Sequence, residues 1–225
     1  HAVISEKVEY RNLKLAIIDE QHRFGVNQRI AIVDKGKNIN LLVMTATPIP
    51  RSLALTFYGD LEVTNLKQKP FGRKKIETST ISSKKLDGLI DGLKRKIAEG
   101  SKIYWICPSI EESEDNNLIS IEERAKIIAK KFSKFKISIA HGKQSPEERN
   151  NAIYDFKIGK SKILIATTVV EVGMDIPDAD IIVIECANRY GLAQLHQLRG
   201  RVGRSDKKSN CILMFDLPLS DVAQQ

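Results

Sequence analysis

Short, unbroken runs of apolar residues alternate with helical segments along most of this chain. We expect strands in these runs, at residues 13–18, 41–44, 61–66, 76–81, 102–107, 136–140, 162–166, 181–184 and 211–215. Helices are expected between them, at residues 26–33, 53–58, 86–97, 121–132, 146–158 and 192–199. Runs of this kind, without polar alternation, are typical of strands buried on both faces, as in a parallel sheet. The chain is therefore predicted to have an α/β fold with mostly parallel sheets.

A basic segment divides this alternation into two parts. Residues 67–75 contain Pro70, Gly72 and five basic side chains, and a fresh series of strands and helices follows them. We interpret this segment as the connection between two domains, at residues 1–70 and 76–225, with residues 71–75 as the linker. The segment is either a solvated hinge or a contact to a phosphate backbone. The chain begins with His1 rather than Met, so we expect it to be part of a longer protein.

The composition excludes some classes of protein and permits others. The net charge of +8 permits a polyanionic partner such as nucleic acid but does not identify one. No apolar run approaches the roughly 20 residues of a membrane span, and the first residues carry no signal-peptide pattern. Cys107, Cys186 and Cys211 lie far apart in apolar runs, which favours reduced core residues over a disulfide or a metal site. A reducing compartment is therefore expected.

Two carboxylates, Asp19 and Glu20, directly follow the first strand. In open α/β sheets, ligands bind at the carboxyl ends of the strands. An Asp at this place can hold Mg²⁺, because hard cations prefer oxygen ligands, and a Glu can orient or deprotonate an attacking water. A solvated loop with two acidic residues is the alternative interpretation.

Hydroxyl side chains follow two other predicted strands. Thr45 and Thr47, after the second strand, offer hydroxyls that can bridge two sites through short hydrogen bonds, although an ordinary Thr/Pro turn is the alternative. Thr167 and Thr168 follow a later strand, where hydroxyls and backbone N–H groups can hold a phosphodiester backbone without reading bases. Asp175, shortly afterwards, can accept hydrogen bonds from a ribose.

The run at residues 194–204 ends a helix and gathers three arginines around two glycines. Three apolar residues at three-residue spacing, Leu192, Leu195 and Leu198, predict the buried face of that helix. A guanidinium is a permanent cation with forked donors, so it suits phosphate oxygens. The arginines after the helix are therefore expected to reach the phosphates of a nucleotide across a cleft. A solvated basic helix end is the alternative.

No stretch of the chain supplies the phosphate-binding loop Gly-x-x-x-x-Gly-Lys-Ser/Thr. The sequence Gly159-Lys160-Ser161 resembles the end of such a loop, but Tyr154 stands where the first glycine is required. This segment also follows a helix and precedes a strand, which is the reverse of the order that the loop needs. We therefore reject this interpretation.

Several of these motifs resemble, in the same order, those of superfamily 2 helicases. Asp19-Glu20-Gln21-His22 is similar to motif II (Walker B), and the longer run 18–26 resembles the RecG branch-migration helicases in particular. Further similarities lie at residues 45–51 (motif III), 110–114 (the segment after motif IV), 141–142 (motif IVa, in outline only), 167–177 (motif V) and 197–204 (motif VI). The resemblance covers nearly the whole chain.

The resemblance implies two RecA-like P-loop NTPase helicase domains with mostly parallel sheets. Residues 1–70 would be the C-terminal half of a truncated first domain, and residues 76–225 the second domain. ATP and Mg²⁺ are the implied cofactors. The implied site residues are Glu20, Gln197, Arg201 and Arg204 for catalysis; Asp19, Gly173 and Asp175 for nucleotide binding, with Asp19 also at the metal; His22, Thr45 and Thr47 for coupling; and Arg51, His141, Gly142, Thr167 and Thr168 for DNA binding.

In function, the resemblance implies a motor that remodels stalled replication forks and branch-migrates Holliday junctions in recombination and repair. Its implied place is the bacterial cytoplasm, at the nucleoid and away from membranes. The full-length parent is expected to be an ATP-dependent DNA helicase. This chain alone is expected to lack ATPase activity, because it has no Walker A loop. Its expected partners are branched DNA and the missing N-terminal wedge and Walker A half of the same protein.

Two alternatives to this function stay open. The translocase domains of the transcription–repair coupling factor share Thr-Ala-Thr-Pro-Ile-Pro-Arg and a similar motif VI, although Asp-Glu-Gln-His and Ile-Glu-Glu-Ser-Glu favour RecG. The chain could also be a non-catalytic piece that binds DNA or a partner protein, since the lysine-bearing phosphate loop is absent from it.

Overall fold

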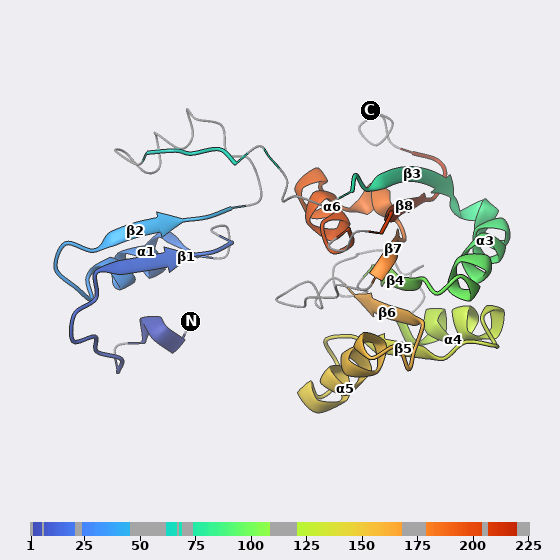
Figure 1. Cartoon of the computed structure of the whole chain (residues 1–225), viewed down its shortest axis with the longest axis horizontal. Coiled ribbons are helices and arrows are strands. Elements are labelled where there is room, and N and C mark those ends of the chain that lie inside the picture. The colour runs from blue at the N-terminus through green and yellow to red at the C-terminus, as the bar shows by residue number, and fades with distance from the viewer. Residues whose placement is uncertain are drawn as a thin grey trace. The chain divides into compact units, whose positions relative to one another are not determined.

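The computed structural model describes residues 2–5, 7–20, 24–45, 62–66, 68, 74–108, 121–167, 179–203 and 207–219. The chain divides into two compact units, His1–Leu66 and Lys67–Gln225, and each is described by itself (Figure 1). The division falls at the start of the basic segment that was interpreted as a connection. Within the described ranges, none of the helices combines the length and the apolar character of a membrane span.

The first unit contains a two-stranded parallel sheet. Its elements are the 3-10 turn η1 (Ala2–Ile4), β1 (Leu15–Ile18), α1 (Val26–Val33) and β2 (Asn40–Val43). The helix α1 lies in the crossover between the two strands, because a parallel pair cannot be joined by a tight hairpin. The register places Ile18 opposite Val43. The helix occupies its predicted residues, and both strands lie close to their predicted positions.

Only one face of this small sheet is buried. Ala16 and Ile18 are 4% and 2% exposed, whereas Leu15 and Ile17 are 52% and 56% exposed. Successive side chains of a strand point to opposite sides, and here only one side is covered. The prediction of a strand buried on both faces is therefore wrong for β1. It is also wrong for β2, where Leu42 is 48% exposed.

The strand predicted at residues 61–66 is also not found in the described part of that segment. Residues 62–66 have no strand structure, although their sequence is largely apolar or β-branched. Local composition is a weak guide here, because a strand needs a neighbour with which to pair.

We expect the two units to differ in independent stability. A polypeptide of residues 67–225 should unfold cooperatively, whereas residues 1–66 alone should not, because an isolated pair of short strands is only marginally stable in water. Urea unfolding followed by far-ultraviolet circular dichroism checks this, and a sigmoidal transition is expected only for the longer polypeptide. A cooperative transition in the shorter polypeptide would show that its sheet is sufficient by itself.

The second unit is built on a six-stranded, entirely parallel sheet with the order β3-β8-β7-β4-β6-β5. Its strands are β3 (Glu77–Ser82), β4 (Lys102–Cys107), β5 (Ile137–Ala140), β6 (Ile163–Thr167), β7 (Ala179–Ile184) and β8 (Asn210–Phe215). Its helices are η3 (Ser83–Lys85), α3 (Leu86–Ala98), α4 (Ile121–Lys131), α5 (Pro146–Lys157), η6 (Ala187–Arg189) and α6 (Leu192–Arg199). The strands and α-helices predicted for this part of the chain are thus confirmed.

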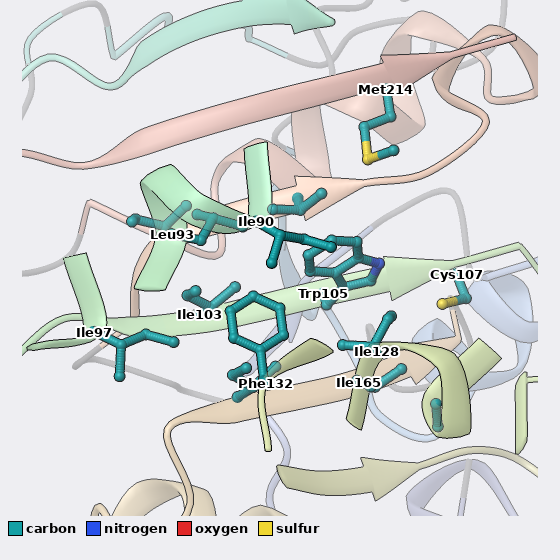
Figure 2. Packing of buried hydrophobic residues seen from close by; sticks show 14 of the residues in the cluster. Ile90, Leu93, Ile97, Ile103, Trp105, Cys107, Ile128, Phe132, Ile165 and Met214 are labelled. Atoms are coloured by element: carbon teal, nitrogen blue, oxygen red, sulfur yellow. The ribbon is translucent and has the colours of Figure 1, made fainter. Parts of the chain in front are cut away.

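Two apolar clusters attach the helices to opposite faces of this sheet. On one face, α3 and α4 pack on alternate residues of the central strands around Trp105, whose ring lies 6.5 Å from that of Phe132 (Figure 2). On the other face, α5 and α6 contribute Phe156 and Leu198 to a cluster with Tyr104. Strands covered on both sides need apolar side chains on both sides, which explains the unbroken apolar runs.

Local sequence signals set the ends of α5 as predicted. The hydroxyl of Ser145 accepts a hydrogen bond from the N–H of Glu148 at 3.2 Å, and the Glu148 carboxylate accepts one from the N–H of Ser145 at 3.0 Å. This reciprocal pair is the capping box that the pattern Ser-x-x-Glu at residues 145–148 predicts. After the helix, Gly159 has a φ of 79°, a left-handed conformation that glycine adopts without strain. The same pattern at residues 120–123 predicts a cap for α4, but Ser120 lies outside the described residues.

Candidate functional site

The two carboxylates predicted in the first unit lie where β1 ends. The backbone N–H of Glu20 donates to Oδ1 of Asp19 at 2.8 Å. Glu20 has a left-handed backbone with a φ of 52°, which is unfavourable for a residue with a side chain and turns the chain at the edge of the sheet. Asp19 is exposed and Glu20 is partly buried, so the two carboxyl groups occupy different environments.

Asp19 and Glu20 are chemically suited to a Mg²⁺ ion that takes its other ligands from phosphate groups and water. Mg²⁺ is usually held by one or two carboxylates and completes its octahedral shell with water and substrate oxygens, so it needs no cage made of protein alone. Asp19 supplies an exposed carboxylate at the carboxyl end of a strand. Across the described ranges, no group of three or more His, Cys, Asp or Glu side chains forms a cage of its own.

Thr45 leaves β2 at the same edge of the sheet as the two carboxylates. The strands are parallel with Ile18 opposite Val43, and the N–H of Met44 donates to the carbonyl of Ile18 at 2.8 Å. This pairing brings Thr45 to the edge at which Asp19 lies, and the Thr45 side chain is exposed. Three other residues predicted in this region lie outside the described residues: His22, Thr47 and Arg51.

In the second unit, α6 presents Gln197 and leads into the turn that carries Arg201. The N–H of Arg201 donates to the carbonyl of Leu198 at 3.0 Å, and both Gln197 and Arg201 are partly exposed. Gly203 follows with a φ of 77°, and a Cβ atom there would lie 2.8 Å from Cγ1 of Ile76. The close return of the chain after Arg201 therefore requires glycine at this position.

One leucine anchors α6 to the sheet. Leu198 is 0% exposed and Leu195 packs partly buried against the same cluster, but Leu192 is 86% exposed. The predicted buried face is therefore wrong at Leu192. An α-helix has about 3.6 residues per turn, so positions spaced by three drift around its axis, and Leu192 lies about 120° from Leu198.

The predicted DNA-binding side chains of the second unit are largely buried. His141 is 8% exposed, and its Nε2 lies 3.7 Å from Oε1 of Glu122 on α4. The backbone N–H of His141 donates to Oε1 of Gln144 at 3.0 Å. Thr167 is 5% exposed, and its hydroxyl has no hydrogen-bond partner among the described residues. Gly142 is exposed, so its backbone is the accessible group at the end of β5. Four other predicted residues lie outside the described residues: Thr168, Gly173, Asp175 and Arg204.

A buried polar cluster joins the carboxyl ends of β4 and β7, and we did not predict it from the sequence. Glu185 directly follows β7 and is 7% exposed. Its Oε1 accepts a hydrogen bond from Nε1 of Trp105 at 2.6 Å, and both of its oxygens accept from Nε of Arg124, at 2.8 and 3.0 Å. The signal in the sequence is a charged residue placed directly after the apolar run 181–184.

Burial and charge act in opposite directions on this cluster. Burial raises the pKa of the Glu185 carboxyl, and the charge and hydrogen bonds of Arg124 offset part of that rise. Burial by itself would lower the pKa of Arg124, but the carboxylate of Glu185 raises it above the ordinary value. Each charge therefore opposes the effect of burial on the pKa of its partner, and removing either group would leave the other buried without its partner.

The three cysteines are free thiols in environments that suppress their ionisation. Burial raises the pKa of Cys186 to about 12, and Asp216, which accepts a hydrogen bond from Sγ of Cys186 at 3.4 Å, contributes to the rise. Burial likewise raises the pKa of Cys211 to about 11 and that of Cys107 well above its ordinary value. We expect the native chain to react with Ellman's reagent near neutral pH far more slowly than the urea-unfolded chain, because the thiolate is the reactive form. Rapid modification of any thiol in the native chain would contradict this expectation.

The sequence of the chain matches the family described as the helicase conserved C-terminal domain over residues 84–206. It is similar to the ATP-dependent DNA helicase RecG of Thermotoga maritima, with 46% identity over 215 residues, which are 95% of this chain and 28% of that protein. RecG of Escherichia coli K12 is 43% identical over 229 residues, covering 100% of this chain and 33% of that protein. The chain therefore spans about a third or less of the length of these curated relatives.

Solved structures resemble the whole chain. The structure of RecG bound to a three-way DNA junction aligns with a TM-score of 0.75 and 39% identity, covering 100% of this chain and 28% of that one. Dbp5 of Saccharomyces cerevisiae, bound to RNA and ADP BeF3, aligns with a TM-score of 0.62 over 94% of this chain and 55% of that one. At 20% identity, this second likeness shows the fold alone. The predicted RecA-like helicase fold with mostly parallel sheets is thus confirmed.

Proposed function

Because this chain belongs to the family that shares the helicase conserved C-terminal domain, we propose that it is the motor part of a longer, RecG-like ATP-dependent DNA helicase. This proposal rests on the positions of the side chains proposed for catalysis, in a chain that is 46% identical to a RecG protein. Asp19 and Glu20 stand at the carboxyl end of β1, and Arg201 stands in the glycine-bounded turn after α6. The full-length protein, and not this chain alone, is proposed to hydrolyse ATP.

In the proposed reaction, a water attacks the γ-phosphate of ATP, and ADP leaves. Asp19 would hold Mg²⁺, which when bound would neutralise negative charge on the phosphate oxygens. Glu20 orients the attacking water and accepts its proton. Arg201 and Arg204 donate to the γ-phosphate oxygens, on which charge builds in the transition state, and Gln197 on the preceding turn assists them.

Movement along DNA is proposed to be driven by this hydrolysis of ATP. The carboxylates belong to the first unit and the arginines to the second, so hydrolysis is proposed to depend on residues of both units and to be coupled to conformational change. Residues proposed to hold the nucleotide or to link its state to DNA are Gly173, Asp175, His22, Thr45 and Thr47. Residues proposed to contact the DNA backbone are Arg51, His141, Gly142, Thr167 and Thr168. Of His141 and Gly142, the exposed backbone of Gly142 is proposed to make the contact, because His141 is buried and its imidazole faces Glu122.

The proposed substrate is branched DNA, as in a stalled replication fork or a Holliday junction. The supporting observations are the likeness to a RecG structure that is bound to a three-way DNA junction and the net charge of +8, which favours a polyanion. The matching place of action is the bacterial cytoplasm at the nucleoid, where such DNA is found. The N-terminal wedge and the Walker A half are proposed as partners within the same protein.

The test is ATP hydrolysis, with and without forked DNA, by this chain and by a chain extended N-terminally over the phosphate-binding loop. Activity is expected only in the extended chain, and Glu20→Gln should abolish it. Glu9→Gln is the matched control, because Glu9 is an exposed acidic residue of the same unit. Hydrolysis by the short chain would overturn this account of nucleotide binding.

Two further outcomes would favour the alternatives. DNA binding without hydrolysis in either chain would favour a non-catalytic module. Hydrolysis that forked DNA stimulates no more than linear duplex would favour the transcription–repair coupling factor.

A further inference from the structure

Two polar contacts hold the first turn of α4 against the carboxyl edge of the sheet in the second unit. Arg124 bonds to Glu185 after β7, and Glu122 lies 3.7 Å from His141 after β5. In the sheet, β4 and β6 lie between β7 and β5, so the start of α4 connects the ends of two strands that are not neighbours. On the sheet face that α4 covers, Trp105 and Ile128 belong to one buried apolar cluster (Figure 2).

Hydrogen bonds from two side chains orient the carboxylate of Glu185. Three hydrogen bonds converge on its two oxygens, two from Nε of Arg124 and one from the indole of Trp105. The side chains of Arg124 and Glu185 are only 19% and 9% exposed, so solvent screens the ion pair little. The backbone of Glu185 is held as well, because its N–H donates to the carbonyl of Ile106 at 3.0 Å.

Glu185 is also the first residue of the connection that leads to the arginine-bearing turn. Cys186 follows with a left-handed φ of 49°, and then come η6 and α6. The direction in which the chain leaves β7 is therefore set at Glu185 and Cys186. We propose that Arg124 is a positioning residue for Arg201, acting through Glu185 to fix the path from β7 to α6. This role rests on the proposed function, in which Arg201 contacts the γ-phosphate.

A buried ion pair contributes little to the net stability of a fold, but it can fix the orientation of the two side chains that form it. Replacing both partners with uncharged groups is often neutral or even stabilising, whereas removing one partner leaves an uncompensated buried charge. The paired replacement therefore separates the two roles. If Arg124 only stabilises the fold, an uncharged pair should restore both stability and activity. If Arg124 positions Arg201, stability should return without activity.

The variants are Arg124→Met, Arg124→Lys and the double replacement Arg124→Met with Glu185→Gln, made in the full-length protein. The amide that replaces the carboxylate in the double variant keeps an acceptor for Trp105 without a charge. Lysine keeps the cation and has a similar reach, so Arg124→Lys should retain most of the activity. Lys126→Met is the matched control, because Lys126 is an exposed cation on the same helix. The readouts are the melting temperature and the kcat and KM of DNA-stimulated ATP hydrolysis.

We expect Arg124→Met and the double variant to lose at least about tenfold in kcat with little change in the KM for ATP, since a misplacement of about 1 Å remote from the chemistry can cost about 100-fold. The double variant should melt near the wild-type temperature. Wild-type kcat in the double variant would overturn the positioning role. An inactive wild type would instead refute the proposed function, so the two failures are distinguishable.

A spectroscopic readout tests the contact itself in this chain. Trp105 is the only tryptophan, so its indole N–H gives one resonance in a ¹⁵N–¹H spectrum. Its short bond to Glu185 should move this resonance away from the position of a free indole. Arg124→Met should shift it, and Lys126→Met should not. No shift in the Arg124 variant would mean that Arg124 does not set the orientation of Glu185, which would also overturn the proposal.

Discussion

Replacing Arg201 with alanine in the full-length protein is expected to lower the kcat of DNA-stimulated ATP hydrolysis by about 10³-fold or more. The guanidinium is proposed to meet charge that builds on the γ-phosphate only in the transition state, so the KM for ATP should change little. The turn that holds Arg201 is closed by a hydrogen bond from the Arg201 N–H to the Leu198 carbonyl, and the chain returns through Gly203. A steady-state phosphate-release assay with saturating forked DNA measures both constants.

The matched control for this prediction is Arg95→Ala. Arg95 is an exposed arginine on α3, so its loss makes the same change in net charge in the same unit. Its kcat should remain that of the wild type. Equal losses in the two variants would indicate a general effect of charge on DNA binding, and wild-type kcat in Arg201→Ala would remove Arg201 from the catalytic machinery.

Replacing Leu198 with alanine is expected to lower the free energy of unfolding of the second unit by about 2–5 kcal/mol. Leu198 is 0% exposed and is the only fully buried residue of α6. Its truncation removes apolar contacts and leaves a cavity beneath the helix that carries Gln197. Urea unfolding of this chain, followed by far-ultraviolet circular dichroism, measures the loss.

The control for this second prediction lies on the same helix. Leu192 is 86% exposed, so Leu192→Ala should change the free energy of unfolding by no more than about 0.5 kcal/mol. Equal effects in the two variants would mean that both leucines act through helix propensity and not through burial. A small change in the free energy of unfolding for Leu198→Ala would show that neighbouring side chains fill the space left beneath α6.

The sequence was sufficient to predict the elements of the second unit because their signals are local. The run at residues 102–107 is apolar at nearly every position, and β4 is buried along its whole length. Ser145 and Glu148 are close enough in the chain to cap α5 with each other, whatever surrounds them. For the candidate site, the same reasoning placed Asp19 and Glu20 at the end of a strand and Arg201 after a helix, and the structure confirms these local positions.

The predictions that failed depend on what lies beside an element. Leu15 and Ile17 are apolar, but no part of the sequence pattern says which side of β1 is covered, and the structure leaves both exposed. Leu192 follows the same three-residue spacing as Leu195 and Leu198, but it lies outside the face of α6 that packs against the sheet. Exposure is a property of the packed molecule, so the spacing of residues alone does not determine it.

The α/β fold class, the cap of α5 and the chemical types at the strand ends could all be read from the sequence, because each depends on neighbours within a few residues. The strand order and the pairing of Arg124 with Glu185, which are 61 residues apart in the chain, depend on how the whole unit packs. In the sequence, Arg124 is one of many cations on an amphipathic helix. It becomes a specific partner because α4 packs across the end of β7, where a buried carboxylate requires a donor.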